Sequence, residues 1–561
     1  MRNRGLGLWL VGVAAAALVT GAATAHGQSA PAAGPSETKA LNAGVVPAPA
    51  RRPGEGLGPF RKMVIRGVTV IDGTGSPPRG PIDIVVENNR ITAMRPAGTP
   101  GLPLKAGRAP SDADYELDAT GMYAMPGFID MHAHGSGTDK APDLSYSYKL
   151  WLAHGVTSVR SVPLAPLEVS LSEKRRSAAN EIAAPRIFAC QRPGDGAGWG
   201  GKPIDGEAAA RAWTQWAAKQ GVDCVKIMLP ADFSPAAFKG VVEEARKLGL
   251  GTTAHLTQTG LSRIDARKAG AMGLGTVTHF YGHMESLLKN GAVQHYSTDY
   301  NFNDEQYRFA EVADIWDQTY EPGSDEWKAY LREQKANNVT FDPTMTIYAA
   351  SRDLMRARNA DWHESYTTPQ LWDYFQSNRE NHGSYFFDWT TRIEVQWRRF
   401  YDRYMRLVND YKNIGGRVTI GTDSGFIFKT YGFGYPEEME LLQEAGFDPL
   451  EVIQAATWNG ALTLYEPKGV AEPPVGALLV GRLADIVLVK ENPLQNFKTL
   501  YGTGTPRLNE ATQKQERVGG VSYTVKDGIV YDAKKLLADV AEMVAAEKRR
   551  AGWPDKGVPR P

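Results

Sequence analysis

The sequence predicts an α/β protein in which a (β/α)8 TIM barrel is combined with a small β-sandwich domain built from both termini. Two observations lead to this fold class. Across the middle of the chain, short apolar strands alternate with helical segments, a pattern typical of parallel βα units that close into a barrel. On both sides of this region, β-branched runs separated by turn residues predict short strands, and 561 residues are enough to bury a large core.

Two strand-rich blocks, residues 61–124 and 466–535, flank the barrel region and predict the β-sandwich. In the first block, the β-branched run Met63–Ile71 ends at the turn signal Asp72-Gly73, and the second block repeats this texture. Because the two blocks enclose everything else, we expect their strands to form one domain. Beyond them, residues 536–561 predict a C-terminal helix and a polar tail.

The barrel region spans residues 125–465. Its predicted strands are short and apolar, and polar or Gly-rich turns follow them: residues 126–134, 156–160, 224–228, 251–255, 276–279, 339–347 and 417–420. Helical patterns lie between them, and one begins at Ser234-Pro235, an N-cap followed by a proline in the first helical turn. This order predicts a parallel barrel whose strands all point their carboxyl ends to one mouth.

Residues 281–336 form an insertion that is rich in Tyr, Trp, Asp and Glu and longer than an ordinary βα loop. We expect it to contribute to substrate specificity, although its residues do not identify a substrate. Residues 353–411 predict further helices that carry four tryptophans, Trp362, Trp372, Trp389 and Trp397. Aromatic residues at helical spacing usually mark packing, so we expect peripheral helices here, with a substrate wall as the alternative.

The N-terminus predicts export. Residues 1–25 combine a basic start with an apolar run, Leu6–Val19, and a small-residue cleavage site at Ala23-Thr24-Ala25, as in a secretory signal peptide. The run is short for a membrane span, so we expect no stable span after cleavage, with an uncleaved anchor as the alternative. Residues 26–60 are rich in Ala, Pro and Gly and predict a disordered leader. The expected location is the bacterial periplasm or the outside of the cell.

Composition restricts the partners and the metal ligands. Lys plus Arg and Asp plus Glu both number 63, and this balance gives no support for a nucleic-acid partner, which requires a basic surface. Cys190 and Cys224 are too few for a disulfide-rich scaffold or a thiolate metal cluster. We expect Cys224 to be a small barrel-core residue, with a metal ligand as the alternative. A metal would therefore be held by histidine and carboxylate.

Six residues at predicted strand ends suggest a metal site. His132 and His134 lie two apart in Met125–His134, so their imidazoles project from the same face of a strand. Each of the other four ends an apolar strand: Lys226, His255, His279 and Asp423. The carboxyl ends of barrel strands converge on one mouth, so residues far apart in sequence meet there. Imidazole and carboxylate groups are common ligands of Zn²⁺ and similar ions.

Several motifs around these residues carry a family resemblance. They are Pro126-Gly-Phe-Ile-Asp-Met-His-Ala-His134, Gly155-Val-Thr-Ser-Val-Arg160, Gly221-Val-Asp-Cys-Val-Lys-Ile227, Thr253-Ala-His255, Val277-Thr-His279, Gly421-Thr-Asp-Ser-Gly425 and Gly481-Arg-Leu-Ala-Asp-Ile-Val487. Together they resemble the amidohydrolase superfamily, and within it the imidazolonepropionase-like and prolidase-like metal-dependent hydrolases. The resemblance covers roughly residues 61–536. Each motif alone is weak, whereas the set is specific.

The resemblance implies a role for each of the six residues. It assigns the ligands to two divalent metals, with Zn²⁺ as the expected ion: His132, His134 and Asp423 at one, His255 and His279 at the other. Lys226, carboxylated by CO2, would bridge them; a single ion and an unmodified lysine are the alternatives. Asp423 is then the expected catalytic residue, because it can accept a proton from a metal-activated water and pass it to the leaving amine.

Three further residues are candidates for substrate contacts. Tyr348 lies just past the seventh predicted strand and could steady an oxyanion, with a buried structural tyrosine as the alternative. His283 follows closely after the sixth strand, where a structural polar contact is the alternative. Arg160 ends the second strand and could bind a substrate carboxylate or form an ion pair within the barrel. By contrast, His154 stands at a helix end, where we expect it to cap the helix.

These observations predict an exported, metal-dependent amidohydrolase that hydrolyses a C–N amide bond, peptide-like, N-acyl or cyclic, in a small-molecule substrate. Ester or lactone hydrolysis on the same site is the alternative among enzymes, because one fold hosts many chemistries. A catalytically silent metal-binding barrel is the alternative outside them. The sequence does not identify the substrate, and it leaves the oligomeric state open, a homo-oligomer included.

Overall fold

The structure is a computed structural model that describes residues 44–137, 139–229, 233–289, 305–377, 383 and 389–553. The predicted signal peptide and the first part of the predicted leader lie outside these residues, as does the middle of the 281–336 insertion. Within the part of the chain that the structure describes, no helix is both long and apolar enough to cross a membrane.

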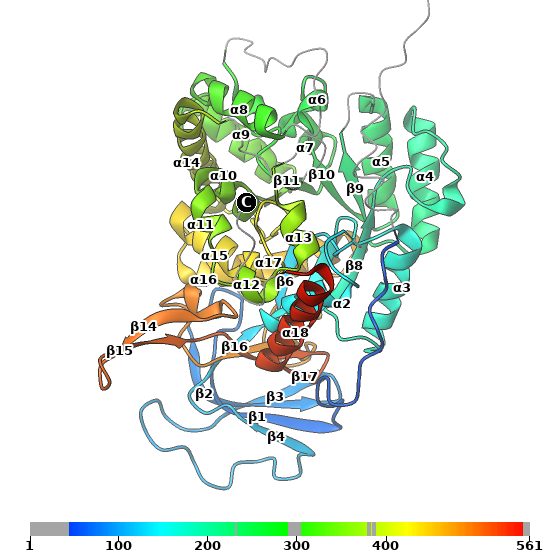
Figure 1. Cartoon of the computed structure of the whole chain (residues 1–561). Coiled ribbons are helices and arrows are strands. Elements are labelled where there is room, and N and C mark those ends of the chain that lie inside the picture. Colours follow the sequence, from blue (N-terminus) through cyan, green and yellow to red (C-terminus); the bar gives the residue numbers. More distant parts are fainter. Residues whose placement is uncertain are drawn as a thin grey trace, which may run out of the picture.

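A parallel sheet of seven strands forms the centre of the molecule (Figure 1). Its strands follow one another in sequence order: β6 (Phe128–Ala133), β7 (Val156–Ser161), β8 (Arg186–Gln191), β9 (Cys224–Met228), β10 (Gly251–His255), β11 (Thr276–Thr278) and β12 (Thr340–Asp342). Each strand pairs in parallel with the next. Sequential order with parallel pairing is the arrangement of a (β/α) barrel.

Residues 417–423 close the gap between the two edge strands of this sheet. On one side, the amide of Thr419 donates to the carbonyl of Phe341 in β12 at 3.0 Å. On the other side, the amide of Met131 in β6 donates to Ile420 at 2.8 Å, and the amide of Asp423 donates to His132 at 2.9 Å. The segment therefore occupies the eighth position of the barrel, although its pairing is less regular than that of the seven strands.

Helices connect the strands and cover the outside of the barrel (Figure 1). Their bounds are α2 (Ser145–Ala153), α3 (Leu167–Ala178), α4 (Glu207–Gln220), α5 (Pro235–Lys247), α6 (Gln258–Leu261), α7 (Ala266–Ala271), α8 (Glu305–Ile315), α9 (Asp325–Ala336), α10 (Met345–Arg352), α11 (Leu354–Arg358), α12 (His363–Tyr366), α13 (Pro369–Tyr374), α14 (Thr391–Asn413), α15 (Gly434–Ala445), α16 (Pro449–Ala456) and α17 (Trp458–Tyr465). The N-cap predicted for α5 is present, since the hydroxyl of Ser234 accepts from the amide of Ala237 at 3.1 Å. The strand predicted over 339–347 is wrong beyond Asp342, because the chain turns there into α10.

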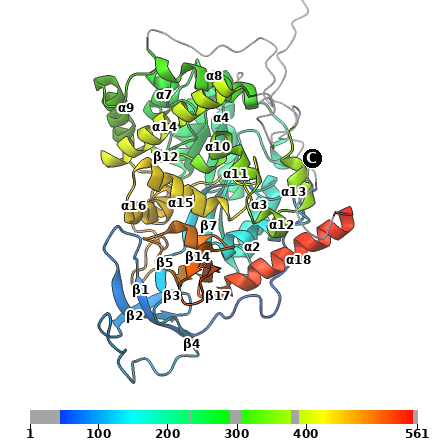
Figure 2. The same ribbon diagram turned by 60° about the vertical axis from the view of Figure 1, so that its left-hand side comes forward.

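The two terminal blocks do form one sheet, which lies beneath the barrel in Figure 2. Its strand order is β17-β16-β13-β5-β1-β2-β3, with β4 beside β1. The N-terminal strands are β1 (Lys62–Val70), β2 (Arg79–Glu87), β3 (Arg90–Pro96), β4 (Tyr115–Asp118) and β5 (Tyr123–Pro126), and the C-terminal ones are β13 (Ile486–Val489), β16 (Val521–Lys526) and β17 (Ile529–Asp532). The hydrogen bonds record one continuous sheet, so the two packed layers of a sandwich stay a prediction. A separate hairpin, β14 (Thr505–Asn509) and β15 (Lys514–Val518), and the C-terminal helix α18 (Ala533–Ala551) complete this part.

The second part of the predicted leader is ordered, which corrects the expectation of disorder for residues 44–60. Ala48 is buried, and its amide donates to the carboxylate of Glu173 in α3 at 3.2 Å. The amide of Arg51 donates to the carbonyl of Glu181 at 2.7 Å, and Leu57 pairs with Val530 in β17. The segment is rich in Pro and Gly, yet its backbone groups find partners on both the barrel and the terminal sheet, and these contacts hold it in place.

A disulfide joins Cys190 in β8 to Cys224 in β9. The two residues are direct neighbours in the parallel register, with their Cα atoms 4.4 Å apart. Cys224 is buried, as predicted for a barrel-core residue, but its sulfur is bonded to Cys190 and does not serve as a metal ligand. The pairing was missed because the sequence analysis did not recognise β8, so the register that brings the two residues together was not visible.

His154 joins the barrel to the C-terminal block. Its Nδ1 lies 2.7 Å from the carbonyl of Leu150 in α2, and its Nε2 accepts from the amide of Gly502 at 3.0 Å. The imidazole is fully buried, and burial lowers the pKa of His154 to about 4. The neutral ring therefore bonds a helix end and a loop at once, a structural role like the one expected.

We predict that this histidine makes the protein sensitive to acid. In the unfolded chain His154 takes up a proton near its ordinary pKa of 6.5, whereas in the folded protein it resists protonation down to about 4. The folded state therefore loses stability as the pH falls from 6.5 to 4, by about 1.4 kcal/mol per pH unit. In thermal unfolding, the stability gap between the wild type and His154→Gln should shrink between pH 7 and pH 5. It should stay constant between pH 7 and pH 9, and a constant gap over the acid range as well would contradict the assignment.

Candidate active site

His132 and His134 stand at the carboxyl end of β6, whose residues are all buried. Asp130 fixes this strand end: its carboxylate accepts from the amides of His132 and Thr422, both at 3.0 Å, and from the Thr422 hydroxyl at 2.7 Å. Burial raises the pKa of Asp130 to about 7. These bonds tie β6 to the eighth segment of the barrel, so the two imidazoles and Asp423 are held by the same local network.

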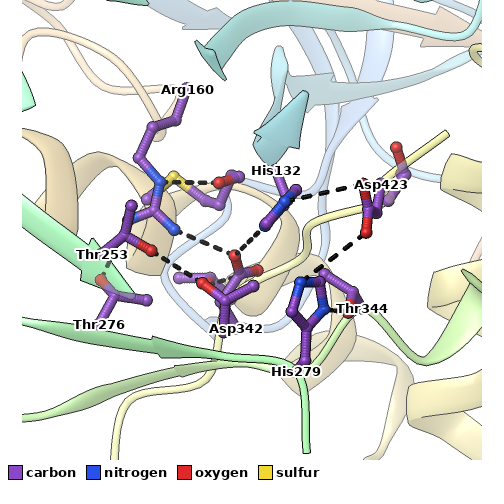
Figure 3. Close-up of polar contacts among 12 residues, drawn as sticks. His132, Arg160, Thr253, Thr276, His279, Asp342, Thr344 and Asp423 are labelled. Atoms are coloured by element: carbon purple, nitrogen blue, oxygen red, sulfur yellow. Dashed lines mark hydrogen bonds and ion pairs between the residues drawn. The ribbon is translucent and has the colours of Figure 1, made fainter. Parts of the chain in front are cut away.

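The carboxylate of Asp423 faces three imidazoles, and two of them, those of His132 and His279, are labelled in Figure 3. Its Oδ1 lies 3.4 Å from Nε2 of His134 and 3.7 Å from Nε2 of His132, and its Oδ2 lies 3.8 Å from Nε2 of His279. One ligand atom from each of His132, His134 and Asp423 can be chosen so that all lie within 4.8 Å of one another. The spacing is that of donors arranged around a common centre.

Lys226 and His255 complete the cluster on the neighbouring strands β9 and β10. Nζ of Lys226 lies 3.4 Å from Nε2 of His132, and the ring of His255 lies 4.7 Å from that of His279 between centroids. Lys226 is fully buried, and burial lowers the pKa of its amine to about 7. Burial likewise lowers the pKa of His132 well below its ordinary value, so the imidazole is neutral and its lone pair is available to a metal.

All six predicted residues line one pocket at the mouth of the barrel. They come from five positions of the barrel: β6, β9, β10, β11 and the eighth segment. The other described lining residues are Arg192, Met228, Tyr281, Phe309, Ile347, Tyr348 and Phe426. The structure thus brings together every residue of the predicted metal site.

Asp342, at the end of β12, is a part of the site that the sequence analysis missed. Its Oδ2 accepts from Arg160 at 3.0 Å and lies 3.6 Å from Nδ1 of His132 (Figure 3). Asp342 and Arg160 are both buried. This separation is too long for a hydrogen bond, so Asp342 acts on the orientation of His132 through its charge. The signal was present in the sequence, since Asp342 ends a β-branched strand as Asp423 ends another.

Arg160 does not contact the pocket, which corrects its assignment to substrate binding. Its Nε donates to the carbonyl of Met131 at 2.7 Å, and a terminal nitrogen donates to the hydroxyl of Thr276 at 3.0 Å. With the bond to Asp342, the guanidinium is fully engaged beneath the site. The ion pair within the barrel, the alternative left open by the sequence, is the observed arrangement.

His283 does not reach the pocket either. Its Nδ1 lies 2.5 Å from the hydroxyl of Tyr330 in α9, and its ring packs 4.2 Å from that of Phe341 between centroids. The ring is buried, and burial lowers the pKa of His283 to about 3. His283 therefore helps to hold the 281–336 insertion against the barrel, and its proposed contact with substrate is wrong.

Tyr348 does line the pocket, on the helix α10. Glu438 fixes the start of this helix, because its carboxylate accepts from the amides of Met345 and Thr346 at 2.8 and 2.6 Å. The preceding residue, Thr344, has a left-handed backbone with φ of 48°, and its hydroxyl lies 2.6 Å from Nδ1 of His279. The same turn thus places Tyr348 in the wall and orients His279.

Three residues of this site have a left-handed backbone. Besides Thr344, both His279 and Asp423 have positive φ, at 69° and 51°. Residues other than glycine adopt this region at an energetic cost, so the surrounding bonds must hold them there. At Asp423 the amide bond to the carbonyl of His132 does so, and at His279 the amide donates to the carbonyl of Asp342 at 3.0 Å.

The insertion and the tryptophan-bearing helices have different relations to the pocket. Phe309 of α8, within the insertion, lines the pocket directly. Trp397 of α14 is buried behind it, with its ring 5.1 Å from that of Phe309 and 6.3 Å from that of Tyr348 between centroids. Trp362 stacks on Phe433 at 4.9 Å. Both tryptophans pack the peripheral helices, as expected, and Trp397 also supports the pocket wall from outside.

Known proteins resemble this chain in part of the sequence and in the fold. The N-acyl-D-aspartate deacylase of Alcaligenes xylosoxydans xylosoxydans is 35% identical over 107 residues, which are 19% of each chain. The ochratoxinase of Aspergillus niger is 31% identical over 100 residues, 17% of this chain and 18% of that protein. The matches thus span about a fifth of the length of these curated relatives.

A likeness to solved structures extends over most of the chain. A Xaa-Pro dipeptidase crystallised with methionine in its active site has a TM-score of 0.53 at 17% identity, covering 84% of this chain and all of that one. At this identity the likeness shows the shared fold alone. The model of the amidohydrolase family, however, matches residues 123–530, which include the whole barrel and the C-terminal strands. The chain belongs to the amidohydrolase family.

Proposed function

We propose that this protein is an exported, metal-dependent hydrolase that cleaves a C–N amide bond, peptide-like, N-acyl or cyclic, in a small molecule. One observation carries the proposal: four imidazoles, a carboxylate and a buried lysine from five barrel positions meet in one pocket. Family membership supports hydrolysis of C–N bonds, as do relatives named as a deacylase and an ochratoxinase. Export rests on residues 1–25, which lie outside the described part of the chain.

The residues fit a divalent metal such as Zn²⁺. Imidazole and carboxylate are the donors that Zn²⁺ prefers, and His132, His134 and Asp423 offer three of them within 4.8 Å of one another. The carboxylate of Asp342 faces Nδ1 of His132, which leaves Nε2 as the ligand atom on the side of Asp423. His255 and His279 would hold a second ion beside the first.

If it were carboxylated by CO2, Lys226 would supply an anionic ligand that two ions could share. An ammonium cannot bind a metal, whereas a carbamate offers two anionic oxygens. The amine of Lys226 contacts the imidazole of His132, and no carboxylate among the described residues lies within ion-pair distance of it. The charges of Asp423 and Asp342 act on this amine, but neither carboxylate forms with it the direct ion pair that a buried structural lysine usually has. We therefore propose the carboxylated form in the functional enzyme.

The chemistry would proceed as hydrolysis by addition to the carbonyl. A divalent metal held by these ligands would supply a water molecule activated for attack and would polarise the carbonyl oxygen. Asp423 is partly open to the pocket, and its two oxygens face different imidazoles. It takes a proton from the attacking water as the C–O bond forms, and it gives a proton to the amide nitrogen as the C–N bond breaks. Tyr348, in the wall, is placed to steady the carbonyl oxygen during this step.

We predict that metal and CO2 are both required for full activity. Chelation should abolish hydrolysis of a panel of dipeptides, N-acyl amino acids, cyclic amides and lactones, and added Zn²⁺ with bicarbonate should restore it. Metal analysis and intact mass should show two metals and the mass of one CO2, which Lys226→Ala should lose and the exposed-residue control Lys202→Ala should keep. One metal without an adduct would favour the mononuclear site, and hydrolysis of lactones alone would favour the other carbonyl chemistry.

We also predict that Asp423→Asn lowers kcat by about 10²-fold to 10⁴-fold, because the amide cannot carry the proton. Metal content is measured on the same sample, so that loss of the ion and loss of proton transfer are separated. Asp118→Asn, an exposed substitution in the terminal sheet, should leave the rate unchanged. Undiminished hydrolysis by a fully metal-loaded Asp423→Asn enzyme would contradict the role of Asp423, and a metal-loaded wild type inactive on every substrate would favour a silent binding barrel.

The ion pair beneath the site gives a third prediction. Asp342→Asn leaves the buried Arg160 without its anion and should destabilise the fold by about 3–5 kcal/mol. The double variant Arg160→Met/Asp342→Leu removes both charges and should recover part of that loss. Metal affinity should be about 10-fold to 100-fold weaker in both variants, because His132 loses its orienting partner. If the double variant binds metal like the wild type, Asp342 acts on stability only. Thermal unfolding and competitive metal titration measure the two effects.

A further inference from the structure

The walls of the pocket above the six-residue centre differ from the centre in chemistry. Six of the described wall residues are apolar or aromatic: Met228, Tyr281, Phe309, Ile347, Tyr348 and Phe426. Arg192 is the only charged residue among the described residues of the walls. A single guanidinium in an otherwise apolar wall is well placed to discriminate between ligands, because a charge interacts strongly where water is scarce.

Arg192 lies across the mouth from the aromatic wall. It directly follows β8, the third strand in the order of the barrel, whereas Ile347 and Tyr348 lie on the helix that follows β12, the seventh. In a barrel with eight positions, the third and the seventh are opposite each other. The cluster around Asp423 lies at the mouth between these two sides. A molecule spanning the mouth would therefore have one end at Arg192 and the other at Tyr348.

We propose that Arg192 binds a carboxylate of the substrate and so selects amides that carry an anionic group on the amine side of the scissile bond and an apolar acyl group. The carboxylate lies at Arg192, the scissile amide lies over the centre, and the acyl group packs against Tyr348 and Phe309. This inference rests on the proposed hydrolase function. It transfers to Arg192 the contact that the sequence suggested for Arg160.

The surroundings of Arg192 suit this role. A guanidinium presents two parallel N–H groups that match the two oxygens of a carboxylate, a geometry that a lysine ammonium lacks. The carboxylate of Asp195, on the same loop, accepts from Gln191 at 3.3 Å; burial raises the pKa of this carboxyl, and the charge of Arg192 offsets part of that rise.

Three benzamides of matched shape test the proposal: N-benzoylglycine, N-(hydroxyethyl)benzamide and N-(aminoethyl)benzamide. They place an anion, a neutral hydroxyl and a cation at the same distance from the scissile bond, and none has a stereocentre. The metal-loaded wild type should show kcat/KM about 10-fold to 100-fold higher for the anion than for the neutral compound, mainly through KM, with the cation lowest. In Arg192→Gln this selectivity should fall to near unity, and Arg192→Lys should keep part of it.

Controls separate this inference from the proposed function. Arg175→Gln removes an exposed arginine of α3 and should keep the wild-type selectivity. Calorimetric binding of benzoylpropionate, a ketone isostere of N-benzoylglycine with no amide to cleave, reports on Arg192 without hydrolysis. Tight binding that Arg192→Gln weakens, with no hydrolysis of any amide, would refute the hydrolase and keep the anion site. Equal wild-type rates for the anion and the neutral compound, or an equal loss for both in Arg192→Gln, would overturn the proposal.

Discussion

The closure of the barrel by residues 417–423 is the constraint on which the rest of the site depends. This segment hydrogen-bonds to β12 on one side and to β6 on the other, and the last of these bonds joins the amide of Asp423 to the carbonyl of His132. The two residues that face each other across the proposed metal position are thus tied through their backbones. If the hydrogen bonds of residues 417–423 were broken, the barrel would keep most of its hydrophobic core, but the six residues of the centre would lose their relative positions.

Beneath the pocket, a chain of contacts between buried polar and charged groups runs from the barrel interior to its mouth. Arg160 is held by a backbone carbonyl and a threonine, Asp342 by Arg160, and His132 by the carboxylate of Asp342. The two charged groups, Arg160 and Asp342, each have a partner that offsets part of their desolvation, which is how buried charges are tolerated. The resulting network has few alternative arrangements, so it restricts the orientation of His132. Burying these charges lowers the stability of the fold, and in return the site is already organised in the folded protein.

The sequence predicts the centre of the site better than its surroundings. Residues such as His132, His255 and Asp423 were identifiable because a barrel brings its strand ends together whatever the details of the loops. Asp342 and Arg192 were missed because their roles depend on which strands are neighbours and on the position of β8, which carries no strong periodic signal. Arg160 and His283 were predicted to contact substrate because the sequence showed the strand end and the loop on which they lie. How deeply each side chain is buried depends on tertiary packing, which the sequence does not show. The contacts that hold residues 44–60 in place could not be predicted for the same reason, since the partners of these residues lie far away in the sequence.

The disulfide between β8 and β9 has a consequence for how recognition is coupled to the centre. Cys224 lies two residues before Lys226 on β9, so the two side chains project to the same side of that strand, and Cys190 lies two residues before Arg192, which directly follows β8. The covalent bond therefore acts as a fixed spacer between the wall that would recognise a substrate and the lysine of the centre. In an oxidising compartment this spacing is set by chemistry, whereas in a reducing one it would rest on backbone hydrogen bonds alone. Whether Cys190 and Cys224 are oxidised or reduced would then determine how rigidly the distance between Arg192 and Lys226 is fixed.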